Sequence, residues 1–216
     1  MDYYLSTAKT LLEGVKVTIT IFSLTLVLSL PLGLILAFAR KSKFKVISKI
    51  IGIYTWIVRG TPLLLQLFFV LYGLPIIFGS SYTFSRMESA ILTFVINYTA
   101  YFVEIFRGGI ESVSEGQYPA GKVLGLSSFQ IKRYIIAPQA IKKVLPTITN
   151  EAITLIKDTS LVASIAIYDI LKYAKDAVGH DVRFEPYIVA AIFYLFLSYI
   201  VVKIFEKIEK KYAFYA

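Results

Sequence analysis

Two stretches of this 216-residue chain carry carboxylate, amide and hydroxyl side chains at helical spacing. The first stretch holds Asn97, Tyr101 and Glu104, and the second holds Thr147, Asn150, Glu151, Thr154 and Asp158. Spacings of three, four and seven residues place side chains on one face of a helix. Such faces are suited to binding a polar ligand, above all a cationic one, or to pairing with charges on neighbouring helices.

The residues around these polar groups are too apolar for a soluble domain. Hydrophobic residues make up 57% of the chain, and the mean hydropathy is +0.69, whereas soluble domains contain about 45–50% apolar residues. About 20 apolar residues span a bilayer as a helix, so the sequence predicts one all-α integral membrane domain over 1–216. An ionised side chain at the membrane centre costs about 2.5–3.5 kcal/mol on insertion scales, so Glu151 and Asp158 need a function or a partner.

We expect five spans, and the second is interrupted at "RGTP", residues 59–62. The first should bend at Pro31, and it is too long for a signal peptide and is followed by basic residues instead of a cleavage site. A short amphipathic helix is expected in the loop 168–185 after the fourth span. The spans cover approximately 15–39, 44–78, 86–108, 145–167 and 186–205.

The basic residues predict the orientation of these spans. Fifteen Lys and Arg lie in 40–49, 107–143 and the tail from residue 203 onward, against seven on the other side. Cytoplasmic loops carry the excess of Lys and Arg, so the N-terminus should lie outside and the C-terminus in the cytoplasm. The net charge of +9 follows from this topology and requires no nucleic-acid partner.

The segment "GQYPAGKV" at Gly116–Val123 is close to a nucleotide-binding P-loop, G-x-x-x-x-G-K-[ST]. A P-loop joins a strand to a helix, and this segment lies between two expected spans. Val123 also has no hydroxyl for Mg²⁺. The chain is therefore not expected to bind nucleotide.

The long cytoplasmic loop, approximately 111–143, should instead fold into two short helices. These cover 118–124 and 129–143, the second bent at Pro138. Gly125 between them suits a positive φ at a helix end, and Ser127 or Ser128 suits an N-cap. Exposed apolar residues at this tip, Leu124, Leu126 and Phe129, indicate a docking surface for a partner.

This loop resembles the cytoplasmic signature loop of the membrane subunits of ABC importers. That signature has Glu-Ala-Ala, a Gly four residues later, and Ile-x-Leu-Pro after nine more. The corresponding residues here are Pro119-Ala120-Gly121, Gly125 and Ile135-Ile136-Ala137-Pro138, of which the central Gly, the Ile and the Pro match. The segments "VRGTPLLLQLFFVLYGLP", "YFVEIFRGGIESV" and "NEAITLIKDTSLVASI" resemble the branch of the family that carries polar amino acids.

The resemblance implies a five-span permease of the type I importer kind in the inner membrane of a bacterium. It implies a second permease subunit, an extracytoplasmic amino-acid-binding protein and a cytoplasmic ATPase dimer as partners. ATP and Mg²⁺ would act on the ATPase, and no cofactor would bind to this chain. In this family a short cytoplasmic helix, the coupling helix, binds in a cleft of the ATPase. The candidate residues for it here are Ala120, Gly121, Leu124, Gly125, Leu126, Ser127 and Phe129.

The resemblance also implies an α-amino acid substrate, which always carries an ammonium group. Glu151 is the expected counter-ion for it. Exposed backbone N–H groups at the break, near Gly60 and Thr61, suit the substrate carboxylate. The expected hydrogen-bond partners of the substrate are Asn97, Thr99, Tyr101, Asn150 and Thr154.

Structural roles compete with these assignments. Arg107 lies three residues after Glu104 and four before Glu111, so these three residues are expected to form an ion cluster at the cytoplasmic end. Lys157 and Asp158 can pair with other helices or form a gate, and Glu151 can form a salt bridge with a neighbouring span.

A transport pathway that contains the acidic Glu151, with no basic residue plainly at the membrane midplane, favours basic or glutamine-like amino acids over acidic ones. Acidic substrates remain the alternative. A self-sufficient secondary transporter would leave the docking loop without a use. An intramembrane enzyme would need converging nucleophiles or metal ligands, and the chain has no Cys and a single His.

Overall fold

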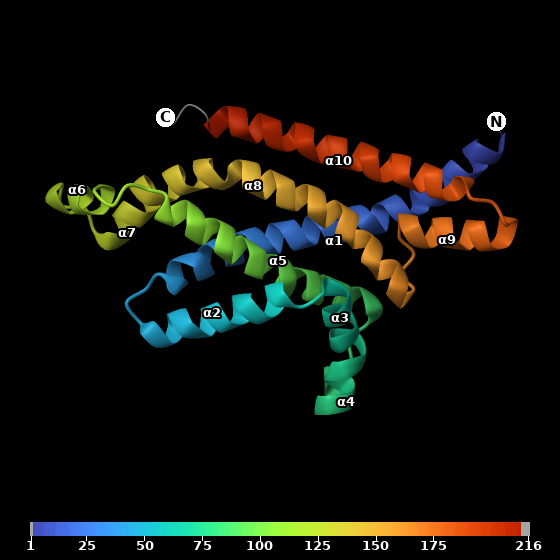
Figure 1. Cartoon of the computed structure of the whole chain (residues 1–216), viewed down its shortest axis with the longest axis horizontal. Helices are drawn as coiled ribbons and strands as arrows, with labels where there is room; N and C mark the ends of the chain where they lie inside the picture. Colours follow the sequence, from blue (N-terminus) through green and yellow to red (C-terminus); the bar gives the residue numbers. More distant parts are fainter. Residues whose placement is uncertain (1, 213–216) are drawn as a thin grey trace.

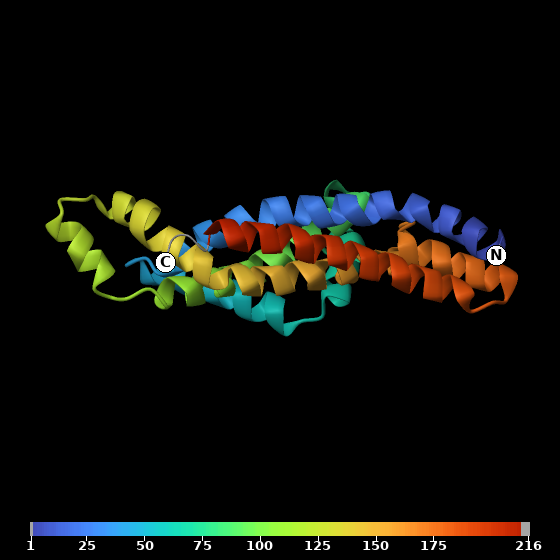
Figure 2. The ribbon, with the colours of Figure 1, turned by 90° about the horizontal axis from the view of Figure 1, so that it is seen from above.

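The computed structural model describes residues 2–212, and this part of the chain is helical without any strand. Four long helices run side by side in an elongated bundle (Figures 1 and 2). They are α1 (Asp2–Arg40), α5 (Arg86–Glu111), α8 (Ala137–Asp158) and α10 (Glu185–Tyr212). The apolar core lies between α1, α5, α8 and α10, which confirms the all-α prediction.

Helix α1 is longer than the sequence predicted. The expected span begins near residue 15, whereas α1 begins at Asp2 and continues through Pro31 to Arg40. Its first turns are held by packing, because Leu11 is fully buried with Ile170 and Ala174 of a later helix. Tertiary contacts therefore extend α1 toward the N-terminus. The residues before 15 are too polar for the sequence to indicate a membrane span there.

The expected break at "RGTP" is present. Helix α2 (Lys45–Gly60) ends there, and α3 (Leu63–Phe68), a π-helical segment (Phe69–Gly73) and α4 (Leu74–Phe78) follow. Pro62 cannot donate a hydrogen bond to continue α2. The two halves meet at 105°, so α3 and α4 turn away from the direction of the bundle (Figure 1).

Three helices in the described part of the chain are long and apolar enough to cross a membrane, or four counting α2 to α4 as one bent span. They are α1, α5 and α10. Helix α8 is not among them, because Lys142, Lys143, Glu151, Lys157 and Asp158 make it too polar. The count of five spans therefore stays a prediction.

The loop over 111–143, which the sequence analysis expects on the cytoplasmic side, differs from its prediction in one respect. Helix α6 (Gln117–Val123) matches the first expected helix. The second expected helix is not separate, because α7 (Ser128–Gln130) and a π-helical segment (Ile131–Ile136) lead directly into α8. Pro138 directly follows the π-helical segment, so it lies inside a continuous helical run, where it offers no N–H to a preceding carbonyl.

The fourth expected span is accordingly displaced. Helix α8 begins at Ala137 instead of near residue 145, and it ends at Asp158. A 3₁₀ helix, Thr159–Ile165, replaces the expected last turns. The helix that carries Glu151 and Asp158 therefore starts within the loop 111–143 itself.

The turn between α6 and α7 forms as expected. Gly125 has φ +76°, its N–H bonds to the Lys122 carbonyl at 3.0 Å, and the Leu126 N–H bonds to the Gly121 carbonyl at 3.1 Å. These two bonds close a Schellman motif. Ser127 then caps α7, because its Oγ accepts from the Gln130 N–H at 3.2 Å and the Gln130 side chain bonds back.

Helix α9 (Ile170–Asp181) is the expected helix of the outer loop, and it packs between α1 and α10. The buried carboxylate of Asp169 caps it, accepting from the Lys172 N–H and the Tyr194 hydroxyl, both at 2.8 Å. Gly14 of α1 lies directly against the start of α9. A Cβ at Gly14 would stand 2.5 Å from the carbonyl carbon of Asp169.

We expect Gly14→Ala to destabilise the protein, because backbone atoms cannot move aside as a side chain can. Overpacking costs about 1–3 kcal/mol, or a fall of several degrees in Tm for a chain of this size. The measurement is thermal unfolding of the purified protein in detergent. Gly179→Ala in α9 is the matched control, because its Cβ meets nothing within 4 Å and should raise Tm slightly through helix propensity. An equal or higher Tm for Gly14→Ala would contradict this packing.

Candidate functional site

A polar cavity of about 490 Å³ lies at the break between α2 and α3. The end of α2 and the break form one wall, and α5, α8 and the start of the 3₁₀ helix form the others. It is lined by Arg59, Gly60, Thr61, Pro62, Leu63, Asn97, Tyr98, Tyr101, Glu151, Thr154, Asp158 and Leu161. Its size is typical of small-molecule sites.

The cavity gathers most of the substrate-site residues predicted from the sequence. Glu151, Thr154 and Asp158 lie at intervals of three and four along α8, and Asn97 and Tyr101 lie four apart on α5. Helical periodicity therefore places each set on one face. Gly60 and Thr61 enter from the break, as expected.

Three predicted residues do not line the cavity. Thr99 is buried elsewhere, with an Oγ1 that has no hydrogen-bond partner. Asn150 and Lys157 are exposed and also absent from the lining. Each of the three is one or two positions from a lining residue. One position along a helix rotates a side chain by about 100°, so these side chains point to other faces of their helices.

Two polar lining residues, Arg59 and Tyr98, were not among the residues predicted for any role from the sequence. The Arg59 guanidinium lies over the Tyr101 ring, 5.3 Å from its centroid, so the cavity lining includes one basic residue. The Tyr98 hydroxyl donates to Asp158 Oδ2 at 2.8 Å, which gives Asp158 the partner on another helix that the sequence allowed. Tyr98 follows Asn97, and Arg59 opens the "RGTP" segment, so both were adjacent to a predicted residue.

The lining has two carboxylates, Glu151 and Asp158, and one guanidinium, Arg59. Its formal charge is therefore −1. Separate negative and positive groups suit a zwitterion, and the excess of one negative charge suits a ligand with one additional positive charge. The lining therefore carries groups complementary to both charges of an α-amino acid.

The residues of the expected ion cluster lie apart from this cavity. Arg107 Nε donates to Glu104 Oε2 at 2.9 Å, and Arg107 Nη1 pairs with Glu111 at 2.6 Å. Glu104 also pairs with Arg40 of α1 and accepts from Thr55 of α2. The cluster therefore links α1, α2 and α5, as a structural group does.

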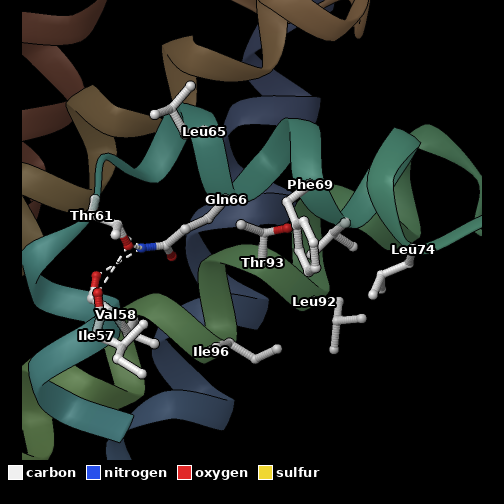
Figure 3. Close-up of a pocket in the computed structure, with 11 residues that line it drawn as sticks. Ile57, Val58, Thr61, Leu65, Gln66, Phe69, Leu74, Leu92, Thr93 and Ile96 are labelled. Atoms are coloured by element: carbon white, nitrogen blue, oxygen red, sulfur yellow. Dashed lines mark hydrogen bonds between the residues drawn. The ribbon is translucent and has the colours of Figure 1, made fainter. Parts of the chain in front are cut away.

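A second cavity, apolar and about 600 Å³, lies on the other side of the break (Figure 3). It is bounded by the end of α2, by α3 to α4 and by α5. Thr61 lines both cavities, and Gln66 lines the apolar one. The break is thus the wall between a polar and an apolar space.

The residues predicted for coupling lie at the tip of the loop, at one end of the bundle (Figures 1 and 2). Leu124 and Phe129 are 75% and 73% exposed, and Ala120, Gly125 and Ser127 are exposed as well. Leu126 is half-buried, and Gly121 is buried against Ile131. The tip therefore presents two large apolar side chains on a hydrogen-bonded turn.

Comparison with known families gives a match over residues 29–213 to the family described as binding-protein-dependent transport system inner membrane component. The arginine transport system permease protein ArtQ of Bacillus subtilis (strain 168) is 34% identical over 202 residues, covering 93% of this chain and 91% of ArtQ. The histidine/lysine/arginine/ornithine transport system permease protein HisM of Escherichia coli (strain K12) is 35% identical, covering 92% and 87%. The glutamine transport system permease protein GlnP of the same organism is 32% identical, covering 93% and 92%.

Solved structures show the same arrangement of helices. One is described as an amino acid ABC transporter with histidines, and it superposes with a TM-score of 0.85 at 32% identity, covering 96% of this chain and 98% of that one. The MetNI methionine ABC transporter in an inward-facing conformation gives a TM-score of 0.73 at 16% identity, covering 94% and 96%. The second likeness supports the fold alone.

Proposed function

We propose a function for this chain from the premise that it belongs to the family of binding-protein-dependent transport system inner membrane components. The chain is the permease subunit of an ABC importer for amino acids, and it is a transport subunit without enzymatic activity of its own. The substrate class, the partners and the orientation are the parts that we propose.

The substrate that fits the cavity best is a basic amino acid. The Glu151 carboxylate is the counter-ion for a substrate ammonium, and Asp158 supplies a second negative charge. Arg59 and the backbone at Gly60 and Thr61 suit the substrate carboxylate. Asn97, Tyr101 and Thr154 supply hydrogen bonds, while Thr99 and Asn150 would act only indirectly.

The observation that carries this proposal is the excess of one negative charge in the cavity lining. Arginine or lysine brings two positive groups and one negative group, and its net charge of +1 is the complement of −1. Glutamine is the second candidate, because the similar protein GlnP is a glutamine permease. The uncharged side chain of glutamine needs no further counter-ion. Glutamate would place a second carboxylate beside Glu151 and Asp158.

The permease needs three kinds of partner to work as an importer. These are a cytoplasmic ATPase dimer that holds ATP and Mg²⁺, a second permease subunit identical or similar to this chain, and an extracytoplasmic amino-acid-binding protein. We place the complex in the inner membrane of a bacterium, with the N-terminus outside and the C-terminus in the cytoplasm. The fifteen basic residues at one end of the spans support this orientation.

Energy would enter through the tip around Gly125. Exposed Leu124 and Phe129 suit an apolar cleft on the ATPase, and Leu126, Ser127, Ala120 and Gly121 keep the turn in shape. Closure of the ATPase dimer on ATP would move this tip as a rigid body. Ion pairs at its rim add about 0–1 kcal/mol each, so the apolar contacts should dominate docking.

The substrate preference is testable without the binding protein, whose own selectivity would otherwise mask it. We expect L-arginine to raise the Tm of the purified permease–ATPase complex at lower concentration than L-lysine, L-histidine or L-glutamine. L-Glutamate should have no effect, because its side chain meets two carboxylates. Uptake of radiolabelled L-arginine by proteoliposomes with binding protein should then require ATP. A response to glutamate above that to arginine, or uptake without ATP, would overturn the proposal.

A further inference from the structure

The side chain of Gln66 in α3 reaches back across the break to the end of α2 (Figure 3). Its Nε2 donates to the Val58 carbonyl at 2.7 Å, and it lies 3.1 Å from the Thr61 carbonyl and 2.8 Å from Thr61 Oγ1. The other end of the same amide is also used, because Gln66 Oε1 accepts from Asn97 Nδ2 at 3.0 Å. One half-buried amide therefore contacts α2, the break and α5.

These contacts occur where the backbone lacks partners. The last four carbonyls of a helix have no N–H donor within the helix, and Pro62 has no N–H to offer them. The Ile57 carbonyl accepts from the Thr61 hydroxyl at 2.9 Å, and the Val58 carbonyl accepts from Gln66. Unpaired backbone groups are costly in a membrane protein, and these two side chains satisfy two carbonyls at the 105° bend.

The contact with Asn97 extends this arrangement into the polar cavity. Asn97 is 4% exposed and lines that cavity, whereas Gln66 lines the apolar cavity on the other side. Because Nδ2 of Asn97 is taken by Gln66, the rotation of the Asn97 amide is fixed by a residue outside the polar cavity. The hydrogen bond thus connects the angle of the break to the orientation of a lining group.

We propose that Gln66 is a positioning residue of the transport site, which fixes the angle between α2 and α3 and the orientation of the Asn97 amide. The proposal rests on the proposed function of the polar cavity. It assigns Gln66 to the substrate site although its side chain does not line that cavity. The two ends of its amide have separable roles, and this makes the proposal testable.

Three variants separate these roles. Gln66→Leu removes both, since it neither donates to Val58 and Thr61 nor accepts from Asn97. Gln66→Glu keeps an acceptor for Asn97, but its carboxylate cannot donate to the Val58 and Thr61 carbonyls. Asn97→Leu leaves the Gln66 contacts with α2 intact and removes the amide from the cavity. Gln139→Leu is the control, because Gln139 also donates to a backbone carbonyl, that of Ile135, away from both cavities.

The bend can be measured directly, because the chain contains no cysteine. Spin labels on Lys49→Cys in α2 and Ile76→Cys in α4, both exposed sites, report the angle as a distance in the reconstituted complex. We expect one narrow distribution for the unsubstituted protein, for Asn97→Leu and for Gln139→Leu. Gln66→Leu and Gln66→Glu should broaden it, and if Gln66→Leu does not fold, Gln66→Glu alone decides.

The second readout is the affinity of the complex for L-arginine. We expect a loss of at least tenfold for Gln66→Leu and Asn97→Leu, a smaller loss for Gln66→Glu, and none for Gln139→Leu. An unchanged distance distribution in both Gln66 variants, or arginine affinity within twofold for Gln66→Leu, would overturn the proposal. If the unsubstituted complex responded to neither L-arginine nor L-glutamine, the proposed function would fail, while the distances would still test whether Gln66 holds the bend.

Discussion

A complex carrying Glu151→Gln is expected to import L-arginine at least tenfold more slowly than the unsubstituted complex. Glu151 is half-buried in the cavity wall, where a substrate ammonium has left its hydration shell. A hydrogen bond to a charged group contributes about 1.5–3 kcal/mol, which corresponds to roughly 10–100-fold in affinity. Glutamine keeps the size of the side chain and removes the charge.

The measurement is ATP-dependent uptake into proteoliposomes, together with the Tm response to L-arginine. Glu13→Gln is the matched control, since Glu13 is an exposed carboxylate on α1 that lies outside the cavity. That variant should transport at the normal rate. Uptake by Glu151→Gln within twofold of normal would show that Glu151 has a structural partner instead of a substrate.

Gly125→Asp is expected to separate ATP hydrolysis from uptake. A side chain at φ +76° costs about 1–2 kcal/mol for a residue other than glycine. The added carboxylate would also lie beside the apolar docking residues Leu124 and Phe129. We expect uptake to fall at least tenfold while the ATPase still hydrolyses ATP, because the tip no longer transmits the movement.

Gly125→Asn is the control for this variant. Asparagine has the shape of aspartate, tolerates the left-handed region and carries no charge, so it should retain more uptake than Gly125→Asp. The Tm of the isolated permease should differ little between the two, because nothing lies within 4 Å of a Cβ at this position. Normal uptake by Gly125→Asp would contradict coupling through this tip.

Local features were predictable from the sequence. The glycine turn at Gly125, the cap at Ser127 and the break at Pro62 each follow from a few adjacent residues whose backbone preferences agree. The grouping of Glu151, Thr154 and Asp158 was predictable for the same reason, because helical periodicity alone places them on one face.

Features that depend on three-dimensional packing were not predictable. The start of α8 at Ala137 depends on a π-helical segment that no propensity marks. Arg59 contacts Tyr101 of α5, and Gln66 contacts the end of α2 across a 105° bend. The sequence predicted the break without its angle. Thr99 and Asn150 lie outside the cavity lining, and a polar residue type does not tell which side of a helix faces a cavity.

The length of α1 has a consequence for the face that we propose to lie outside. Its 39 residues extend about 58 Å at about 1.5 Å per residue, nearly twice the roughly 30 Å of the hydrocarbon layer. The first turns therefore project beyond the lipid, with Tyr3 hydrogen-bonded to Asp181 of α9 at 2.7 Å. A binding protein that docks on this side would meet a preordered helical surface, so little conformational entropy would be lost when it lands.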